Sequence, residues 1–192
     1  NADPRFTRNR IRAELLPLLA EVFRAHGYEG ATLSLIGEAT GLGKGSLYPF
    51  FPGGKQQMAA EVLAEIDGWF ESNIFAALRS SKDPACAIAA MIAAVDAYFN
   101  SGRRVCLVGV IALGPSRDMF AEQVHGYFKR WDEALSRLLA RAGLPARTAR
   151  RRSHDALLTI QGALVLARAL DDPAIFGRAL ADVPARLLGR PD

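Results

Sequence analysis

The sequence predicts an all-α protein of about nine helices, in which a three-helix unit with a helix-turn-helix precedes a larger helical bundle. Apolar residues recur at steps of three and four along almost the whole chain, as they do on one face of an α-helix. The alternation typical of β-strands does not occur, and Gly or Pro stands where most of the apolar runs end.

The composition favours a folded, soluble, cytoplasmic protein. Of the 192 residues, 50% are hydrophobic and 23% are charged, which suits a chain with a sizeable core. Uncharged stretches such as Val105 to Ser116 are shorter than the roughly 18 residues of a membrane helix, and no secretory leader pattern opens the sequence. The 2 cysteines are too few for a disulfide framework or a four-cysteine zinc site. We therefore expect no membrane association, no metal and no cofactor.

The first predicted helix is amphipathic and ends at Gly27. Its apolar side includes Leu15, Leu19 and Phe23. Glycine suits the left-handed backbone conformation that commonly follows the C-terminus of a helix. Pro17 lies within this run and predicts either a kink or a late start of the helix.

Two short helices follow, joined by a tight turn. Thr32 is the expected N-cap of the first, which ends at Gly41. Leu42 and Leu47 would anchor the second short helix to the helices before it. Pro49 has no backbone N–H to donate, so we expect this second helix to end early.

A pair of short helices behind a longer one is typical of a helix-turn-helix, whose second helix enters the major groove of DNA. Lysine offers a cation to phosphates or guanine acceptors, a tyrosine hydroxyl can donate to phosphate, and small residues allow close approach. Helix starts also attract phosphate, because their N–H groups are free and the dipole end is positive. The candidate DNA-binding residues are therefore Thr32, Lys44, Gly45, Ser46, Tyr48 and Lys55.

The formal net charge of +4 is unevenly distributed along the chain. One basic run precedes the predicted helix-turn-helix and favours a polyanionic partner such as DNA. The other lies far along the chain and is expected to be a solvated helix face. The first run consists of Arg5, Arg8, Arg10 and Arg12 against Asp3, and the second of Arg147, Arg150, Arg151 and Arg152.

From about residue 8 to residue 55, the sequence resembles the N-terminal domain of the TetR/AcrR family of transcriptional repressors. The resemblance implies a homodimer whose residues 5–54 bind a pseudo-palindromic operator and whose residues 55–192 bind a small molecule and dimerise. Pro49 departs from the family pattern, which usually has histidine or another aromatic residue there. The matching residues are Phe23, Gly27-Tyr28, Ala31-Thr32-Leu33, Ile36, Gly41-Leu42, Lys44-Gly45-Ser46-Leu47-Tyr48 and Phe51-Pro52-Gly53-Gly54-Lys55.

The sequence contains no visible catalytic constellation. Gly41, Gly43 and Gly45 are spaced wrongly for a phosphate-binding loop, and no metalloprotease, CxxC or nucleophile-elbow motif occurs. The 3 histidines stand singly and are expected at surface or capping positions. We therefore predict no enzymatic activity.

Beyond Lys55 the chain is expected to be helical almost throughout, with no linker or internal repeat. Apolar stripes and Gly or Pro punctuation define each helix. The expected helices run from Lys55 to Ser80, from Pro84 to near Gly102, over residues 105–113, from Phe120 to Gly143, from Pro145 or Arg147 to Leu170, and from Pro173 onward.

The segment from Ala156 to Leu170 is apolar on every face, which is typical of a helix buried on all sides. In a chain of this size, one side would face the core and the other a second subunit. We therefore predict that this helix and the one after Pro173 form a four-helix interface with their symmetry mates. A central core helix of a monomer is the alternative. The candidate interface residues are Leu157, Leu164, Phe176 and Leu180.

A small-molecule pocket is expected between the helices of the C-terminal bundle. Gln161 is a polar residue within an apolar helix and needs a hydrogen-bond partner or a ligand. The segments 106–109, 161–163 and 167–168 are similar to repressors of multidrug-efflux or aromatic-compound genes, which implies an apolar, aromatic effector. The candidate wall residues are Trp69, Phe70, Phe99, Cys106, Met119, Phe128, Trp131 and Gln161, although plain core packing is an alternative for each.

Together these observations predict a ligand-responsive transcriptional repressor that binds a palindromic DNA operator as a homodimer and is released by a small effector. The alternative is a small-molecule-binding helical dimer whose DNA binding is weak or lost because Pro49 spoils the reading helix.

Overall fold

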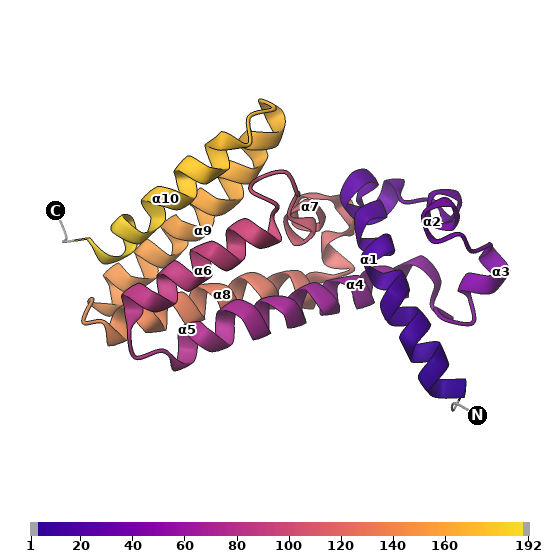
Figure 1. The fold of residues 1–192 in the computed structure, drawn as a ribbon, viewed down its shortest axis with the longest axis horizontal. Coiled ribbons are helices and arrows are strands. Elements are labelled where there is room, and N and C mark those ends of the chain that lie inside the picture. The colour runs from indigo at the N-terminus through magenta and orange to yellow at the C-terminus, as the bar shows by residue number, and fades with distance from the viewer. Residues whose placement is uncertain (1–3, 190–192) are drawn as a thin grey trace. The chain divides into compact units, whose positions relative to one another are not determined.

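The computed structural model describes residues 4–189, with the backbone alone for residues 4–7. All regular elements of this part are helical, which confirms the predicted all-α class (Figure 1). With α4, η1 and α5 counted as one continuous helix, the described residues form about nine α-helices, as predicted. The elements are α1 (Pro4–Gly30), α2 (Leu33–Thr40), α3 (Lys44–Leu47), α4 (Gly54–Phe70), the π-helical η1 (Glu71–Phe75), α5 (Ala76–Ser80), α6 (Pro84–Tyr98), α7 (Leu107–Leu113), the 3-10 turn η2 (Pro115–Asp118), α8 (Ala121–Arg141), α9 (Ala146–Ala169) and α10 (Ala174–Leu188).

Helix ends follow the local signals closely, with one exception in α1. Asp83 caps α6, since its Oδ1 accepts a hydrogen bond from the Cys86 N–H at 3.1 Å. Of the two alternatives predicted from Pro17, a kink or a late start, the late start is excluded, because α1 begins at Pro4 and contains this proline. The backbone instead leaves helical geometry at Gly27 (φ 68°, ψ 177°), where the first helix was predicted to end.

The chain divides into two compact units. Unit 1 comprises the residues up to Asp67 together with Leu107–Val124, and unit 2 comprises Gly68–Cys106 together with the residues from His125 onward. Two of the three dividing points fall inside α4 and α8, so each of these helices contributes residues to both units, and the third lies directly before α7 (Leu107–Leu113). These units differ from the sequence-based domains 5–54 and 55–192, because unit 1 takes in the first turns of α4 and the segment around α7.

Unit 1 is built on α1, which packs against α2 and α7. Its interior contains side chains that are almost completely excluded from solvent, one or more from each of the first helices. They are Leu19 and Phe23 of α1, Ile36 of α2, Leu47 of α3, and Phe51 between α3 and α4. The apolar steps of three and four therefore mark the buried side of α1, as predicted.

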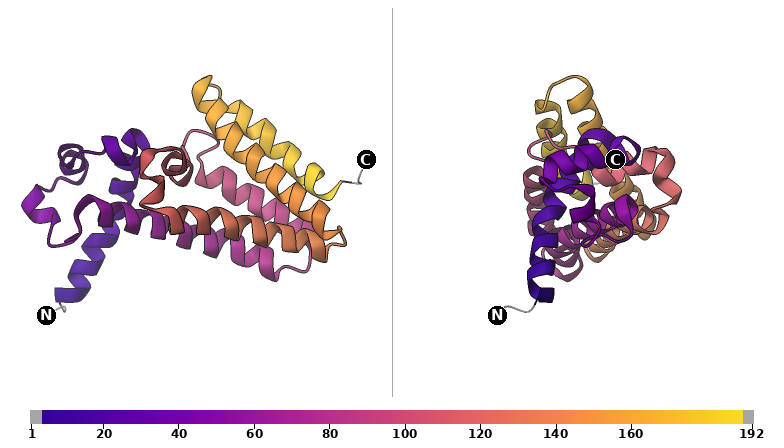
Figure 2. Two further views of the ribbon diagram at one scale, coloured as in Figure 1. Left: turned by 180° about the vertical axis from the view of Figure 1, so that it is seen from behind. Right: turned by 90° about the vertical axis from the view of Figure 1, so that its right-hand side faces the viewer.

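In unit 2, α9 and α10 run antiparallel and side by side, as both views show (Figures 1 and 2). α10 also packs against α6, and α6 packs against η1 and α5. Gly102 follows α6 with φ 88°, and a Cβ at this position would lie 2.6 Å from the Cβ of Phe176. Only glycine therefore allows this turn to pass so close to α10.

The helix from Gly54 to Ser80 widens once, at η1. The side chain of Asn73 donates from Nδ2 to the Trp69 carbonyl oxygen at 2.8 Å within this segment. Phe70 and Phe75, at the two ends of the widened turn, are both fully buried, and their ring centres are 5.9 Å apart. Single π-helical turns inside α-helices are rare and occur often at functional sites.

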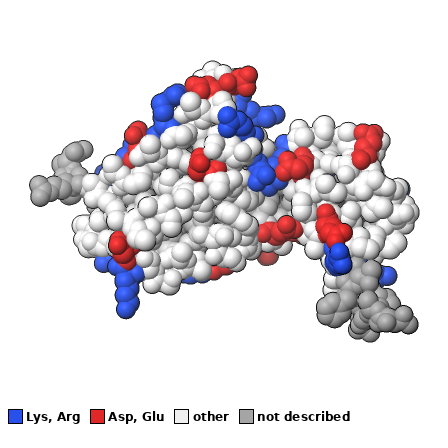
Figure 3. Space-filling view, viewed as in Figure 1, with Lys and Arg blue, Asp and Glu red and all other residues white. Residues whose placement is uncertain are grey.

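The surface of the described residues is mixed in charge. On the face shown in Figure 3, basic and acidic side chains lie interspersed. Exposed ion pairs on α10 and its flanks include Arg178 with Asp172 and Arg186 with Asp182. Within residues 4–189, no helix has the length and apolar character needed to cross a membrane.

Candidate nucleic-acid interface

The second helix of unit 1 is fixed at both ends by the residues predicted to do so. Thr32 Oγ1 accepts a hydrogen bond from the Leu35 N–H at 3.2 Å, which confirms the predicted N-cap of α2. Gly41 adopts the left-handed conformation (φ 71°, ψ 12°), and its N–H donates to the Gly37 carbonyl at 2.8 Å. A Cβ on Gly37 would lie 3.1 Å from the Leu42 carbonyl oxygen, so the turn packs tightly against α2.

α3 is a single exposed turn held by one buried side chain. Leu47 is 1% exposed, whereas Lys44, Gly45 and Ser46 are exposed. Tyr48 follows directly, is 40% exposed, and has its ring centre 5.8 Å from the Lys44 Nζ. These four residues therefore form one polar surface, as the sequence predicts for a reading helix.

The early end of α3 agrees with the expectation from Pro49. The helix stops at Leu47, and the Phe50 and Phe51 N–H groups donate to the Leu47 carbonyl at 3.0 and 2.9 Å. α2, α3 and their turn line an open depression of about 590 Å³, whose lining includes Ser34, Glu38 and Lys44. The polar surface of α3 thus adjoins a recess that contains both an acidic and a basic side chain.

Lys55 lies at the start of α4 as predicted, but its ammonium group is directed at its own chain. Nζ donates to the Tyr28 carbonyl at 2.8 Å and to the Glu29 carbonyl at 3.4 Å. It also lies 4.5 Å from the centre of the Tyr28 ring, a cation–π distance. The side chain is half-buried, unlike that of Lys44.

The basic run ahead of the helix-turn-helix is partly neutralised by neighbouring carboxylates. Arg10 pairs with Glu14 at 3.1 Å on the exposed side of α1. Arg12 forms an ion pair with Glu61 of α4. Arg8 is exposed, and the side chain of Arg5 and all of Asp3 lie outside the described residues. The run therefore offers DNA less free charge than its count of arginines suggests.

The predicted effector residues of unit 2 lie in or beside an aromatic interior. Phe99 and Trp131 are fully buried, whereas Trp69 and Phe128 are half-buried. Phe70 is the centre of this cluster, with ring centres at 5.3 Å from Trp131 and 6.1 Å from Phe99. The rings contact one another, so these residues fill the core in the described structure.

Further aromatic residues of this interior were missed by the sequence analysis, among them Phe75, Tyr98 and Tyr127. Tyr98 and Tyr127 lie 4.8 and 4.9 Å from Phe70, measured between ring centres. Each precedes a candidate residue, Phe99 or Phe128, so the paired aromatics were the signal that could have found them.

The remaining effector candidates differ in their surroundings. Cys106 is buried, in keeping with the expected core filler. Met119 belongs to unit 1 and is 49% exposed, so it is not part of the interior of unit 2. The Nε2 of Gln161 is buried without a hydrogen-bond partner among the described residues. Gln161 therefore keeps the unsatisfied donor that drew attention to it in the sequence.

The faces of α9 and α10 correct the choice of interface residues. Leu164, Phe176 and Leu180 are at most 5% exposed within this single chain, because α9 and α10 pack against each other and α10 packs against α6. Leu157 is half-buried. The prediction that the apolar helix has a second face remains, but that face is formed by the exposed side chains of Leu158, Val165, Leu166 and Leu170.

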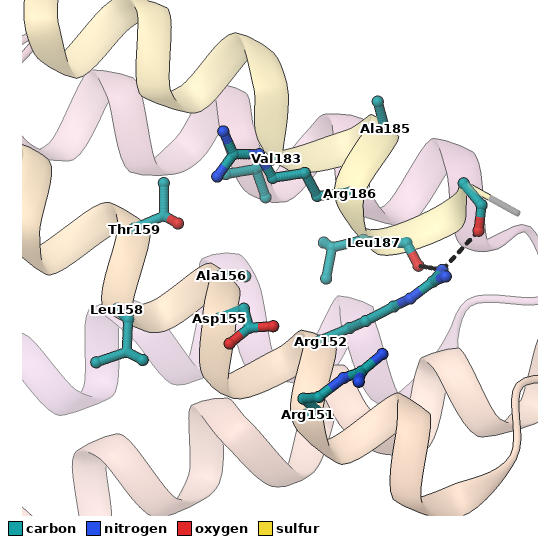
Figure 4. A pocket seen from close by; sticks show the side chains of 11 residues that line it. Arg151, Arg152, Asp155, Ala156, Leu158, Thr159, Val183, Ala185, Arg186 and Leu187 are labelled. Atoms are coloured by element: carbon teal, nitrogen blue, oxygen red, sulfur yellow. Dashed lines mark hydrogen bonds between the residues drawn. The ribbon is translucent and has the colours of Figure 1, made fainter. Parts of the chain in front are cut away.

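A hollow of about 920 Å³ lies between α9 and the end of α10 (Figure 4). Its lining includes Arg151, Asp155, Thr159 and Arg186, and none of the predicted effector residues. Arg152 closes one end, since its Nη1 donates to the Leu187 carbonyl at 2.9 Å and to the Gly189 carbonyl at 2.7 Å. Part of the second basic run therefore caps the C-terminus of α10.

A capped helix, a tight turn and a short exposed helix with a polar surface, all set on a longer helix, define a DNA-binding helix-turn-helix protein. Comparison with known proteins identifies the family. Residues 16–62 match the model of the bacterial regulatory proteins of the tetR family, and residues 84–181 match that of the C-terminal domain of LmrA/YxaF-like transcriptional regulators. The chain therefore belongs to the TetR family and is a transcriptional regulator, not an enzyme.

Individual relatives agree with this assignment. The HTH-type transcriptional regulator LmrA of Bacillus subtilis (strain 168) is 28% identical over 159 residues, covering 81% of this chain and 85% of LmrA. A TetR-family regulator from Agrobacterium tumefaciens has the same fold, with a TM-score of 0.79 at 20% identity over 93% of this chain and 98% of that one. A cysteine mutant of the TetR-family regulator CifR, solved with 26bp operator DNA, has a TM-score of 0.72 at 26% identity over 93% of this chain and 96% of that one.

Proposed function

We propose that the chain is a ligand-responsive repressor that binds a pseudo-palindromic operator as a homodimer and leaves it when a small apolar, aromatic molecule binds unit 2. The observation that carries this proposal is the polar surface of α3, with Lys44, Ser46 and Tyr48 exposed around the buried anchor Leu47. CifR, a relative of the same fold, was solved with operator DNA, which supports the same partner for this chain.

In this proposal the N-terminal residues of α3 meet base edges while α2 lies across the phosphate backbone. Lys44 supplies a cation to phosphate or guanine, and the Tyr48 hydroxyl donates to a phosphate oxygen. Thr32 acts through α2, because its cap fixes the start of that helix, whose positive dipole end favours an approaching phosphate.

Selection of duplexes from a random DNA pool tests the DNA-binding part. We expect an enriched palindrome with half-sites about one helical turn apart, roughly 34–36 Å centre to centre. Lys44→Ala should weaken binding and lower the salt slope by about 1, whereas Tyr48→Phe should weaken it with less effect on the slope. Lys129→Ala, which removes an exposed lysine of unit 2, is the matched control. Weak binding without a consensus sequence would contradict the proposal.

The dimer is supported by the outer sides of α9 and α10. Leu158, Gly162 and Val165 are exposed along one stripe of α9, and the exposed positions of α10 include Gly177 and Ala181. Apolar and small residues on adjacent exposed stripes allow close packing against a second copy of the same pair. Light scattering should give a mass near twice 20.8 kDa, and Leu158→Glu with Val165→Glu should give a monomer. A wild-type monomer at micromolar concentration would rule the dimer out.

The effector part rests on the aromatic interior of unit 2 and on Gln161. A molecule that inserts among these rings would be apolar, and one acceptor on it would satisfy the buried Gln161 Nε2. Aromatic compounds should quench the fluorescence of Trp69 and Trp131 and release the selected operator. Gln161→Leu should weaken release by compounds that carry an acceptor and leave release by pure hydrocarbons unchanged.

Pro49 supports a second candidate function, a small-molecule-binding helical dimer without a DNA role. α3 ends at Leu47, so the reading helix is a single turn. Replacement of Pro49 by histidine separates the two functions. If DNA binding emerges only in Pro49→His, the second candidate is correct; if the wild-type chain already selects an operator, the first is.

A further inference from the structure

The ammonium group of Lys55 is engaged at the end of α1. Lysine has three N–H donors, and two of them find the Tyr28 and Glu29 carbonyls at 2.8 and 3.4 Å. The Tyr28 ring lies 4.5 Å away on another side. These carbonyls follow the break at Gly27, where unpaired carbonyl groups and the negative end of the helix dipole attract a cation.

A second contact joins α1, nearer its beginning, to α4, the helix that contains Lys55. The Arg12 guanidinium pairs with Glu61 and lies 5.6 Å from the centre of the Phe51 ring. Gln57 donates to the same Glu61 oxygen at 2.8 Å and accepts from the Gly53 N–H at 2.7 Å. Arg12 and Glu61 are each less than one-third exposed, so solvent screens this pair less than it does the surface pairs.

The two contacts hold the first turns of α4 at both ends of α1. Lys55 holds the start of α4 to the last residues of α1, beyond the break at Gly27, and Glu61 holds it six residues later to Arg12. Two separated points of attachment prevent translation of a helix and restrict its rotation. α1 carries the helix-turn-helix, so the orientation of α3 follows that of α4.

We propose that Lys55 is a positioning residue for DNA binding and not a phosphate ligand. Through the Tyr28 carbonyl and ring it orients the helix-turn-helix relative to the start of α4, together with the Arg12–Glu61 pair. This inference rests on the proposed function, since it concerns how that DNA-binding surface is held. To reach a phosphate, the Lys55 ammonium would have to leave two carbonyls and an aromatic ring.

The salt dependence of operator affinity separates positioning from phosphate contact. Each cation that contacts a phosphate contributes to the slope of log affinity against log salt. Lys44→Met should lower that slope by about 1. Lys55→Met should weaken binding by about 5- to 20-fold at every salt concentration and leave the slope unchanged. A slope reduction in Lys55→Met equal to that in Lys44→Met would overturn the proposal.

Tyr28 supplies the matched variants, since its hydroxyl takes no part in the contact. Tyr28→Leu removes the ring and should weaken operator binding. Tyr28→Phe keeps the ring and the carbonyl and should retain the wild-type operator affinity. In the Lys55→Met background, Tyr28→Leu should have little further effect. Fully additive losses of affinity would contradict a shared contact. All affinities are measured well below the unfolding temperature, where a purely stabilising residue would leave the affinity of the folded protein unchanged.

Thermal unfolding distinguishes a failure of the proposed DNA-binding function from a failure of the inference about Lys55. If the wild-type chain selects no operator, the proposed function fails, but the contact is still tested by the Tm values of the same variants. Lys55→Met and Tyr28→Leu should each lower the Tm, and the double variant should lower it little beyond the larger single effect. Additive Tm losses would overturn the contact between Lys55 and Tyr28 itself.

Discussion

Unit 1 and unit 2 differ in the contacts that stabilise the interior of each. In unit 1, polar groups reach between segments far apart in sequence: Lys55 binds the Tyr28 carbonyl, Arg12 pairs with Glu61, and Gln123 Nε2 donates to the Ala60 carbonyl at 3.0 Å. In unit 2, polar contacts such as that of Arg152 with the Leu187 carbonyl also occur, but the centre of the unit is a cluster of aromatic rings around Phe70.

The difference indicates what each unit can do. Hydrogen bonds and ion pairs require defined distances and angles, so they fix the orientation of the helices they join. Contacts between aromatic rings tolerate several geometries, so rings can repack around an inserted molecule at modest cost. Unit 1 is therefore suited to present a surface of fixed shape, and unit 2 is suited to accommodate a small molecule.

The largest effect is expected from removing the main ring of unit 2. Trp131 is fully buried against Phe70 and Phe75, and its Nε1–H points at the Met91 sulfur at 3.5 Å. Trp131→Ala should lower the free energy of unfolding by about 3–5 kcal/mol, measured by urea denaturation. Trp69→Ala, at a half-buried position of the same interior, is the control and should cost clearly less. Equal losses would mean that ring packing does not dominate unit 2.

A smaller loss is expected at the turn after α6. Gly102→Ala places a Cβ 2.6 Å from that of Phe176 on a backbone with φ 88°, so strain and overpacking add to about 2–4 kcal/mol. Gly143→Ala has a similar φ, 98°, with open space around it, and should cost about 1 kcal/mol from the backbone alone. Matching values for the two variants would show that the close approach to α10 relaxes freely.

The smallest effect on stability is expected in unit 1, at the ion pair between Arg12 and Glu61. Burial raises the pKa of Glu61, but hydrogen bonds from Arg12 and Gln57 outweigh it and hold this pKa below its ordinary value of 4.5. Because the folded-state pKa is depressed, the carboxylate stabilises the fold above about pH 4.5, and this stabilisation is lost as the pH falls through the lower folded value.

Glu61→Gln should therefore cost about 1 kcal/mol at neutral pH and flatten the acid limb of the stability profile. Chemical denaturation between about pH 3 and about pH 7, roughly the range in which carboxylates titrate, measures both. Glu14→Gln, in the exposed pair with Arg10, is the control and should cost about 0.3 kcal/mol. An unchanged acid limb in Glu61→Gln would show that another carboxylate controls acid unfolding.

Much of the fold was predictable because helix ends depend on neighbours in the sequence. Thr32, Gly41 and Asp83 act on N–H or carbonyl groups within four residues of themselves, so their roles follow from local chemistry. The exposed surface of α3 was predictable for the same reason, since Leu47 and Pro49 determine its anchor and its end.

Side-chain direction was not predictable where it depends on distant segments. Lys55 turns to Tyr28, which is 27 positions earlier, and no local pattern reports that contact. Phe176 was expected to face a partner subunit, but it fills the space left by Gly102. An all-apolar helix such as α9 likewise has no polar stripe to show which face the chain itself covers.

The widened turn η1 has a consequence for helical phase. Residues five apart lie about 140° apart around an α-helix of 3.6 residues per turn, so Phe70 and Phe75 would point to different sides of a regular one. The π-helical turn contains one extra residue, and both rings contact the ring of Trp131 as a result. In genetic terms, the deletion of one codon within residues 71–75 would return the helix to regular phase. Ala76 to Ser80 would then keep their present orientation about the helix axis, because the wider turn accommodates the one residue that the deletion removes.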